Sequence, residues 1–289
     1  MEDNEKTVEI AGSTVHYWVY NPGKKQVIVM IHGFTGDHHG FQKIIPHLRE
    51  YTIIVPDLPG SGKSTITPQH WSIDGIAELT NSFVAALQLK TPPVIFGHSM
   101  GGLVVASMVY QAPQLYAKKM ILLSPVPSKV TLTDSRYIGA KLGELQYWVG
   151  AHVPIVGPKI VKSKWLTKQI ANLLITTKDK QIIQFTYKQM WANLTRISSL
   201  KLYYHLQCDI NRRGAVDYAT ELSKKDLLII GGDKDNVVPP RQLNELVRAT
   251  KAICVYILGV GHDAHYERAK EVANNVMYFL EQGNPSARP

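Results

Sequence analysis

The chain has 289 residues, 45% of them hydrophobic, and a formal net charge of +9. This is enough for one large core, whereas no apolar run approaches the roughly 20 residues of a membrane-spanning helix. Two distant cysteines, Cys208 and Cys254, make no disulfide framework, and the acidic start MEDNEKTVEI does not resemble a secretion signal. We therefore expect one main domain with an insertion, located in the cytoplasm.

The apolar pattern predicts an α/β fold with a doubly wound, mostly parallel sheet. Residues 7–20 alternate around the turn AGS, which predicts an antiparallel hairpin. Helical stretches follow at 71–88, with Ser72 or Asp74 as N-cap, and at 101–112. Short β-branched runs with little alternation, typical of strands covered on both faces, occupy residues 26–33, 51–57, 92–99, 118–125, 226–233 and 252–259.

No comparable strand is expected between residues 126 and 216, a segment rich in Trp and Tyr. We interpret residues 126–216 as an inserted, mainly helical cap, and residues 1–125 and 217–289 as the core domain. The cap holds 14 Lys and Arg against 4 Asp and Glu, so the positive charge of the chain is concentrated there.

Apolar residues of the cap alternate with the cluster Lys159, Lys162, Lys164 and Lys168, as in a helix at a membrane interface. Two interpretations stay open. The cap contacts an anionic membrane peripherally, or it is a solvated basic surface whose apolar side closes a pocket.

The stretch GSGKST at residues 60–65 resembles the end of a phosphate-binding loop. A loop of the type G-x-x-x-x-G-K-[ST] begins with glycine, but Asp57 occupies that position here, and its carboxylate would repel a phosphate. Pro59 removes one of the N–H groups that would bind the phosphate. We therefore expect neither a nucleotide nor a nucleic acid as partner.

Ser99 lies in the G-x-S-x-G pattern of FGHSMGG, between a predicted strand and a predicted helix. That position is what a nucleophile elbow requires, because the serine sits on a sharp turn. Gly97 and Gly101 have no side chains, so the segments on either side of the serine can approach each other closely. A serine hydroxyl is a weak nucleophile at neutral pH, so it needs a base and an orienting acid.

Candidates for both groups follow later strands. Asp233 and Asp235 come at the end of one predicted strand, and His262 follows the next, which gives the chain order Ser, Asp, His. Because the carboxyl ends of parallel strands meet at one edge of the sheet, these side chains can lie together with Ser99.

The chain resembles the α/β-hydrolase family over nearly all of its length outside the insertion. The resemblance rests on motifs in the family's order: HGF (32–34), DLPGSGKS (57–64), GHSMGG (97–102), GDKDNVVP (232–239) and GVGHDAHYE (259–267). One departure is Ala269, which stands where the family often has proline in E-x-P, and it affects a helix start.

The resemblance implies Ser99 as nucleophile, His262 as base and, through the family's G-x-x-D-x-x-x-P spacing, Asp235 rather than Asp233 as acid. It also implies an oxyanion hole built from the backbone N–H groups of Phe34 and Met100. In the family, the loop at 57–64 is a structural turn near the active site, so Lys63 is expected to face solvent.

The function implied is that of a serine hydrolase which cleaves carboxylic esters through an acyl-enzyme, without a cofactor. Similar caps occur in monoacylglycerol lipases and lysophospholipases, which favours an acylglycerol or another lipid-like or short-to-medium acyl ester as substrate. A carbon–carbon bond hydrolase or haloperoxidase-like enzyme would keep the same triad, and a non-catalytic ligand receptor is a further alternative. His265 and the pair His38–His39 suggest metal ligands, but no cysteine or carboxylate spacing completes a site, so we expect no metal.

Overall fold

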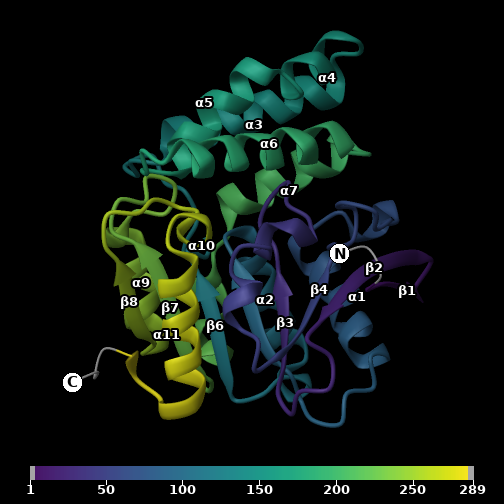
Figure 1. Ribbon diagram of the computed structural model, residues 1–289. Coiled ribbons are helices and arrows are strands. Elements are labelled where there is room, and N and C mark those ends of the chain that lie inside the picture. Colours follow the sequence, from purple (N-terminus) through teal and green to yellow (C-terminus); the bar gives the residue numbers. More distant parts are fainter. Residues whose placement is uncertain (1–3, 286–289) are drawn as a thin grey trace.

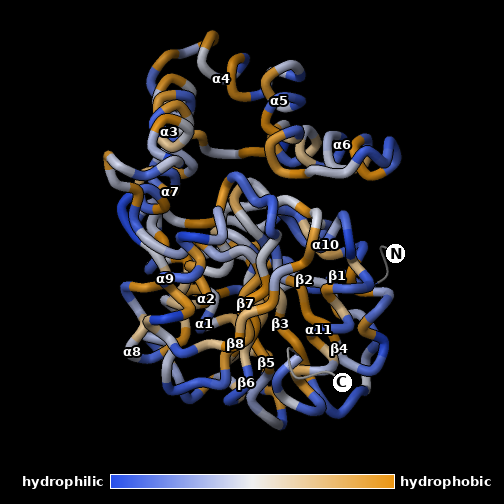
Figure 2. Tube along the Cα trace, turned by 90° about the vertical axis from the view of Figure 1, so that its left-hand side faces the viewer, coloured by the Kyte–Doolittle hydropathy of each residue, from blue (hydrophilic) through white to orange (hydrophobic). Residues whose placement is uncertain are grey.

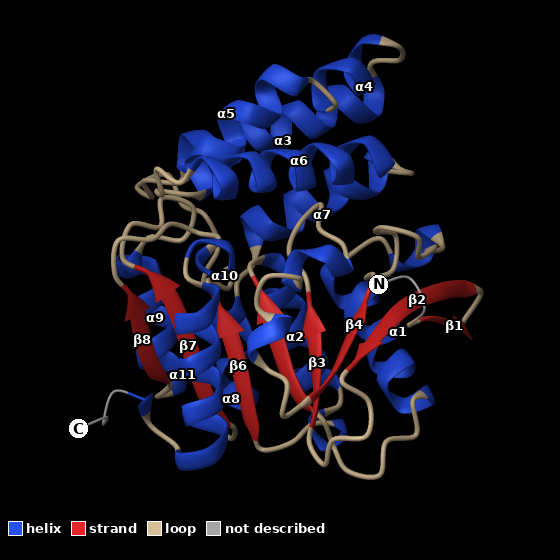
Figure 3. Ribbon diagram, in the orientation of Figure 1, coloured by secondary structure: helices blue, strands red, loops and turns tan. Residues whose placement is uncertain are grey.

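The computed structural model describes residues 4–285, so the outermost limits of the expected core domain, residues 1 and 289, lie outside it. The strands span Glu5–Ile10 (β1), Ser13–Tyr20 (β2), Val27–Ile31 (β3), Thr52–Pro56 (β4), Val94–His98 (β5), Lys119–Leu123 (β6), Asp226–Gly232 (β7) and Ile253–Ile257 (β8). They form one sheet in the order β1-β2-β4-β3-β5-β6-β7-β8, drawn as red arrows in Figure 3. β2 pairs antiparallel with β1 and β4, and the strands from β4 to β8 are parallel, which confirms the predicted α/β fold.

The first two strands form the predicted hairpin. Its two-residue turn consists of Ala11 and Gly12, whose φ angles are +46° and +77°. Positive φ at both central positions gives the turn a twist that matches the twist of paired strands. The register that follows places Val8 opposite Val15.

Helices cover both faces of the sheet, because successive side chains of each buried strand point to opposite faces. Along β3, Val29 and Ile31 belong to one core cluster, and Ile28 and Met30 belong to the other. α1, α2, α8 and α9 pack on the first face, and α10 and α11 on the second (Figure 1). These helices span Ile73–Ala86 (α1), Met100–Gln111 (α2), Ala219–Leu222 (α8), Pro240–Thr250 (α9), Ala264–Glu267 (α10) and Ala269–Gln282 (α11).

Local signals define where these helices begin. Ser72, and not Asp74, is the N-cap of α1, since its hydroxyl accepts the N–H of Gly75 at 3.0 Å. Short 3₁₀ helices occupy His38–Phe41, Ile45–His47, Pro68–His70, Pro113–Leu115 and Ala215–Tyr218.

The segment between β6 and β7 stands over the carboxyl ends of the strands as a separate helical layer (Figure 1). Its helices are Tyr137–His152 (α3), Val156–Val161 (α4), Lys164–Leu174 (α5), Lys180–Arg196 (α6) and Leu200–Arg212 (α7). The two ends of this segment lie side by side, because Ala215 N–H donates to Val126 O at 2.9 Å and Val216 N–H donates to Pro127 O at 3.0 Å. We keep residues 126–216 as the proposed extent of the cap.

The Cα tube in Figure 2 shows how differently apolar residues are distributed in the two parts. In the core they concentrate on the sheet, whereas in the cap they recur along the outer helices α3, α4 and α5. None of the described helices is long and apolar enough to cross a membrane.

Candidate active site

Ser99 occupies a strained turn between β5 and α2. Its φ and ψ are +54° and −121°, a conformation that costs on the order of 1–3 kcal/mol and persists only where the surroundings impose it. A Cβ at Gly97 would lie 2.6 Å from the carbonyl oxygen of Gly101, and a Cβ at Gly101 would lie 2.3 Å from that of Ile31. Strand, turn and helix are therefore packed too closely for side chains at either glycine.

The structure brings the three residues expected at strand ends into one chain of hydrogen bonds. Ser99 Oγ lies 2.9 Å from His262 Nε2, and His262 Nδ1 lies 2.8 Å from Asp235 Oδ2. The other carboxylate oxygen of Asp235 accepts the N–H groups of Val237 and Val238 at 2.8 and 2.7 Å. The acid is thus fixed by the backbone, and its free oxygen orients the imidazole.

Asp233, the alternative acid, has a different contact. Its Oδ1 accepts the N–H of Gly259 at 2.6 Å, which ties the end of β7 to the loop that leads to His262. Its Oδ2 lies near the Lys234 ammonium. Only Asp235 reaches the imidazole, in agreement with the spacing argument.

Charge and burial act on this pair in opposite directions. Burial disfavours the charged imidazolium of His262, but the Asp235 carboxylate outweighs this effect through its charge and hydrogen bond, so the pKa of His262 is raised above its ordinary value. Burial likewise opposes the Asp235 carboxylate, yet His262 and the two backbone donors lower its pKa. The arrangement stabilises a proton on His262, which is what a general base must accept.

The expected oxyanion donors lie beside Ser99. A Cβ at Gly33 would come within 3.1 Å of the Cβ of Ser99, so the loop that carries Phe34 passes directly over the nucleophile. Within the described part of the chain the Phe34 N–H has no acceptor, and Met100 is the first residue of α2, where a helix N–H has no intrahelical partner. Both donors are thus available to a substrate oxygen.

His32 holds this loop in place. Its Nδ1 lies 2.9 Å from Gly33 O, and its Nε2 accepts the N–H of Leu58 at 2.9 Å. These two bonds require the neutral ring, and burial lowers the pKa of His32 accordingly. The residue links the loop after β3 to the loop after β4.

The loop with the GSGK sequence closes around a carboxylate of the chain itself. Lys63 N–H donates to Asp57 Oδ2 at 2.8 Å, and a Cβ at Gly62 would lie 2.0 Å from the same oxygen. The Lys63 side chain is 57% exposed and pairs with Glu5 at 2.6 Å, which confirms that it faces solvent. The position a phosphate would take is occupied by Asp57, so the resemblance to a nucleotide loop is structural.

A cavity of about 610 Å³ opens between the core and the cap, with Ser99, His262, Phe34 and Met100 in its wall. Its cap wall is formed by residues of α3, α5, α6 and α7, which include Leu142, Tyr147, Leu166, Ile170, Leu173, Met190, Leu194 and Ile210. Arg136 also lines it, but Asp134 holds the guanidinium through both carboxylate oxygens. The cavity is therefore predominantly apolar, and among the described residues that line it there is no unpaired Lys or Arg for an anionic group.

Glu267 is a residue of the site that sequence reasoning missed. This buried carboxylate accepts the N–H of Gly261, next to His262, through Oε1, and the N–H groups of Thr176 and Thr177 through Oε2. It therefore joins the end of α5 to the histidine loop. The glutamate of the family's E-x-P motif was a signal that could have identified it.

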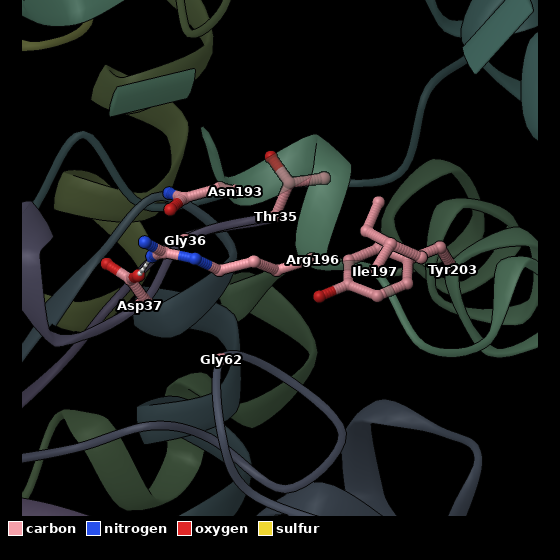
Figure 4. Close-up of a pocket in the computed structure, with 8 residues that line it drawn as sticks. All are labelled: Thr35, Gly36, Asp37, Gly62, Asn193, Arg196, Ile197 and Tyr203. Carbon is pink, nitrogen blue, oxygen red and sulfur yellow. Dashed lines mark hydrogen bonds and ion pairs between the residues drawn. The ribbon is translucent and has the colours of Figure 1, made fainter. Parts of the chain in front are cut away.

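A second link between cap and core lies beside the oxyanion loop. Figure 4 shows the Arg196 side chain, from the end of α6, extending to Asp37, and the two form an ion pair at 3.0 Å. Gln189 donates to the same carboxylate at 3.1 Å. His39 is also bonded to Asp37, which lowers the pKa of this aspartate although burial alone would raise it. The cap is thus tied to a residue three positions after Phe34.

The expectation that no carboxylate completes a site with the histidines weighed as metal ligands is wrong, because the structure places one beside each group. Asp37 lies with His38 and His39, and Asp263 lies with His98 and His265, each group with its ligand atoms within 4.8 Å of one another. Both carboxylates are close to these histidines in the sequence, Asp37 directly before His38 and Asp263 two positions before His265, so only His98 is brought in by folding.

The second of these groups lies behind His262. Burial raises the pKa of Asp263 to about 7 and lowers the pKa of His265 to about 3. His98 is also buried, and its pKa is well below the ordinary value. Asp263 thus changes its charge near neutral pH directly beside the candidate base.

A serine on a strand-to-helix elbow, with its histidine and acid supplied by later strand ends, defines a hydrolase of the α/β class. Sequence comparison agrees with the geometry. The chain belongs to the alpha/beta hydrolase fold family, whose sequence model matches residues 26–269.

Several relatives share nearly the whole chain. It is 29% identical to the uncharacterized hydrolase YugF of Bacillus subtilis strain 168, over 94% of this chain and 96% of YugF. It is 24% identical to lipase 3 of Moraxella sp. strain TA144, over 88% of this chain and 77% of the lipase. The solved enol-lactonase of Burkholderia xenovorans LB400 superposes with a TM-score of 0.79 at 16% identity, over 96% of this chain and 100% of the lactonase, and shares the fold.

Proposed function

We propose that this hydrolase is a serine esterase that cleaves uncharged carboxylic esters with an apolar acyl group. The observation that carries the proposal is the hydrogen-bonded chain from Ser99 through His262 to Asp235 at the wall of an apolar cavity. The names lipase and enol-lactonase, borne by two of the similar proteins, fit ester cleavage.

The first step forms an acyl-enzyme. Ser99 Oγ attacks the ester carbonyl while its proton moves to His262 Nε2, and Asp235 stabilises the imidazolium that results. The carbonyl oxygen becomes an oxyanion held by the N–H groups of Phe34 and Met100, each worth about 3 kcal/mol in the transition state. His262 then returns the proton to the departing alcohol oxygen as the carbon–oxygen bond breaks.

Water completes the reaction along the reverse path. His262 takes a proton from the water as its oxygen attacks the acyl carbon, and the proton passes to Ser99 Oγ when the acid leaves. The balance is one ester and one water consumed, one acid and one alcohol formed. The reaction needs no redox step, and water is the second substrate.

The cavity supports an apolar acyl chain. Its volume lies in the range of about 300–1,000 Å³ usual for small-molecule sites, and its cap wall is built mainly from aliphatic and aromatic side chains. A substrate carboxylate near Arg136 would compete with Asp134 for the guanidinium. We therefore infer neutral esters, with a short to medium acyl chain such as those of small acylglycerols.

Labelling with a fluorophosphonate, followed by a series of p-nitrophenyl esters of increasing chain length, tests the proposal. The expected result is a single adduct on Ser99 and turnover that rises from acetate to medium-chain esters. A labelled protein with no turnover on any ester would point to another reaction with the same triad, such as carbon–carbon hydrolysis or haloperoxidase chemistry. A protein that is neither labelled nor active would be a ligand receptor.

A further inference from the structure

Apolar side chains that face solvent are concentrated on the cap. Of the thirteen large apolar side chains exposed in the described structure, ten belong to the cap: Leu132, Ile138, Leu142, Leu145, Trp148, Ile155, Val156, Ile160, Trp165 and Leu173. Isolated exposed apolar residues need no explanation, but a concentration on one part of a molecule marks an interaction surface.

Four of these residues lie close together in the chain, at the turn into α4 and the start of α5. We call the segment 155–168 the cap tip; its exposed apolar residues are Ile155, Val156, Ile160 and Trp165. α4 is the element most distant from the sheet in Figure 1. The cap tip is therefore the part of the molecule best placed to meet a surface.

Ile155 has a backbone conformation that is unfavourable for a β-branched residue. Its φ and ψ are +68° and −52°, and the N–H of Val156 donates to Pro154 O at 2.7 Å, which together form a γ-turn. Positive φ is strained for a β-branched residue, and the turn leaves the side chain 75% exposed. Neither burial within the chain nor local preference accounts for this isoleucine, whereas an apolar partner that covers it would.

The charged side chains around the cap tip are all basic. No Asp or Glu occurs between residues 145 and 178, while Lys159, Lys164 and Lys168 are exposed there. Lys162, which sequence analysis grouped with them, donates to Thr195 O at 3.2 Å and is only partly exposed. The Lys164 ammonium also lies 4.6 Å from the centre of the Trp191 ring. Exposed apolar residues among exposed lysines match an interface that is apolar inside and anionic at its surface.

The cavity of the candidate active site opens beside the same helices. Leu142 of α3 and Leu173 of α5 both line the cavity and are exposed at 62% and 58%, so the mouth lies between these two helices. On α5, the residues that line the cavity recur at Leu166, Ile170 and Leu173, while Lys164 and Lys168 lie on another side of the helix. One helix thus connects the cap tip to the mouth.

We propose that the cap tip docks on an anionic lipid surface, with Ile155 and Trp165 entering the headgroup region and the three exposed lysines near the lipid phosphates. Docking places the mouth beside the membrane, so an apolar ester enters the cavity from the bilayer. The identity of that substrate rests on the proposed function, but docking itself does not. A second copy of the chain fits less well, because it would bring two strongly basic caps together.

Flotation with lipid vesicles tests docking independently of catalysis when the protein carries Ser99→Ala. Vesicles of phosphatidylcholine alone are compared with vesicles that contain about 30% phosphatidylglycerol, at low and high salt, since each lysine near an anionic surface adds roughly fivefold to binding. We expect binding to the anionic vesicles at low salt, much weaker binding at high salt, and little binding to neutral vesicles.

Two variants on this background separate charge from insertion. Lys159→Gln, Lys164→Gln and Lys168→Gln together are expected to weaken binding roughly a hundredfold. Ile155→Ser with Trp165→Ser is expected to weaken it at least about tenfold, because apolar burial is lost without a change of charge. The matched control is Lys24→Gln, Lys25→Gln and Lys90→Gln, which removes three exposed lysines near the amino ends of β3 and β5 and is expected to change binding less than about twofold.

Each alternative outcome decides against docking at the cap tip. Failure to float with anionic vesicles at low salt, equal binding to neutral vesicles, or equal losses in the control and cap variants would overturn it. Self-association that disappears with Ile155→Ser and Trp165→Ser would assign the surface to a second copy instead. Wild-type turnover of a soluble ester without flotation would leave the proposed function standing, and flotation without turnover would leave docking standing.

Discussion

The core and the cap differ in where their apolar side chains lie and in how their polar groups are held. In the core, apolar strands are covered on both faces, and the polar groups at their ends are held by specific partners, as Asp235 is by two backbone N–H groups. In the cap, apolar side chains such as Ile155 and Trp165 stand in solvent, and the basic residues greatly outnumber the acidic ones.

This difference indicates that the core and the cap have different roles. The core positions atoms for chemistry, which requires rigid, satisfied groups and leaves little freedom of composition. The cap provides the cavity wall and meets the surroundings, so its composition follows the substrate and the surface it contacts. Changes in the core should therefore affect every substrate alike, and changes in the cap should discriminate among substrates.

The largest expected effect comes from Ser99→Ala. Removing the nucleophile should lower kcat on the order of 10⁶-fold for every ester and abolish fluorophosphonate labelling. Turnover measured on short and medium esters, with circular dichroism as the control for folding, checks this. His262→Ala should lose about as much, because triad members act as a unit, and labelling that persists at another residue would end the assignment of Ser99.

Asp235→Asn should cost about 10⁴-fold in kcat, because an amide at this position favours the wrong imidazole tautomer. Its matched control is Asp233→Asn, which removes a carboxylate that contacts Gly259 and not the imidazole, and should cost less than about tenfold. Steady-state kinetics on a soluble ester measure both. The opposite ranking would show that the acid is misassigned.

A cap variant should distinguish substrates where core variants do not. Ile170→Trp fills part of the cavity, so kcat/KM for medium-chain esters should fall about tenfold or more, while the acetate ester should change less than about twofold. Asn172→Trp, which adds the same side chain at an exposed position of α5, is the control. Equal losses for acetate and medium-chain esters in Ile170→Trp would contradict the division between core and cap.

The pH profile tests the electrostatics of the core. His262 must be neutral to act as base, and its pKa is raised above the ordinary 6.5. At pH values below this raised pKa, kcat/KM should fall about tenfold for each pH unit. The Asp263 carboxylate contributes to that increase, so Asp263→Asn should move the acid limb to lower pH. If the acid limb of the kcat/KM profile lies at the same pH in Asp263→Asn and in wild type, Asp263 does not act on the base.

Asp263 should also affect stability with a defined sign. Its folded pKa of about 7 exceeds the ordinary 3.8, so the stability it contributes is present below pH 3.8 and is lost as the pH rises to about 7. Asp263→Asn should therefore gain stability relative to wild type from pH 4 to 7, with a constant difference above. Thermal unfolding at several pH values measures this, and an unchanged difference would contradict it.

The smallest effect is expected for Lys63→Ala. Its ammonium is mostly exposed, pairs with Glu5 and lies 5.7 Å from the centre of the Trp18 ring, so stability should change by less than about 1 kcal/mol and ester turnover by less than about twofold. Calorimetry should detect no binding of ATP or GTP, because Asp57 fills the loop. Micromolar nucleotide binding that is lost in Lys63→Ala would restore the nucleotide interpretation.

Several features of the core were predictable because their signals are local. Runs of β-branched residues such as TIIV specify buried strands, Ser72 and Asp74 indicate a helix start, and the glycines on either side of Ser99 specify a turn that only small residues permit. The spacing around Asp235 pointed to the residue that does contact the imidazole. These signals lie within a few residues of the structure they determine.

What the sequence by itself determined is therefore the order of the core strands, the two helices α1 and α2, and the residues at the strand ends. Tertiary structure alone decided how Glu267 joins α5 to the histidine loop, how Arg196 reaches Asp37, and that Asp57 fills its own loop. It also decided that Lys162 donates to the Thr195 carbonyl, that Lys164 lies over the Trp191 ring, and that Ile155 is exposed to solvent. The physical reason for the contacts between cap and core is distance along the chain: side chains 159 residues apart, as Asp37 and Arg196 are, meet only after the sheet and cap have packed, and no local pattern encodes that contact.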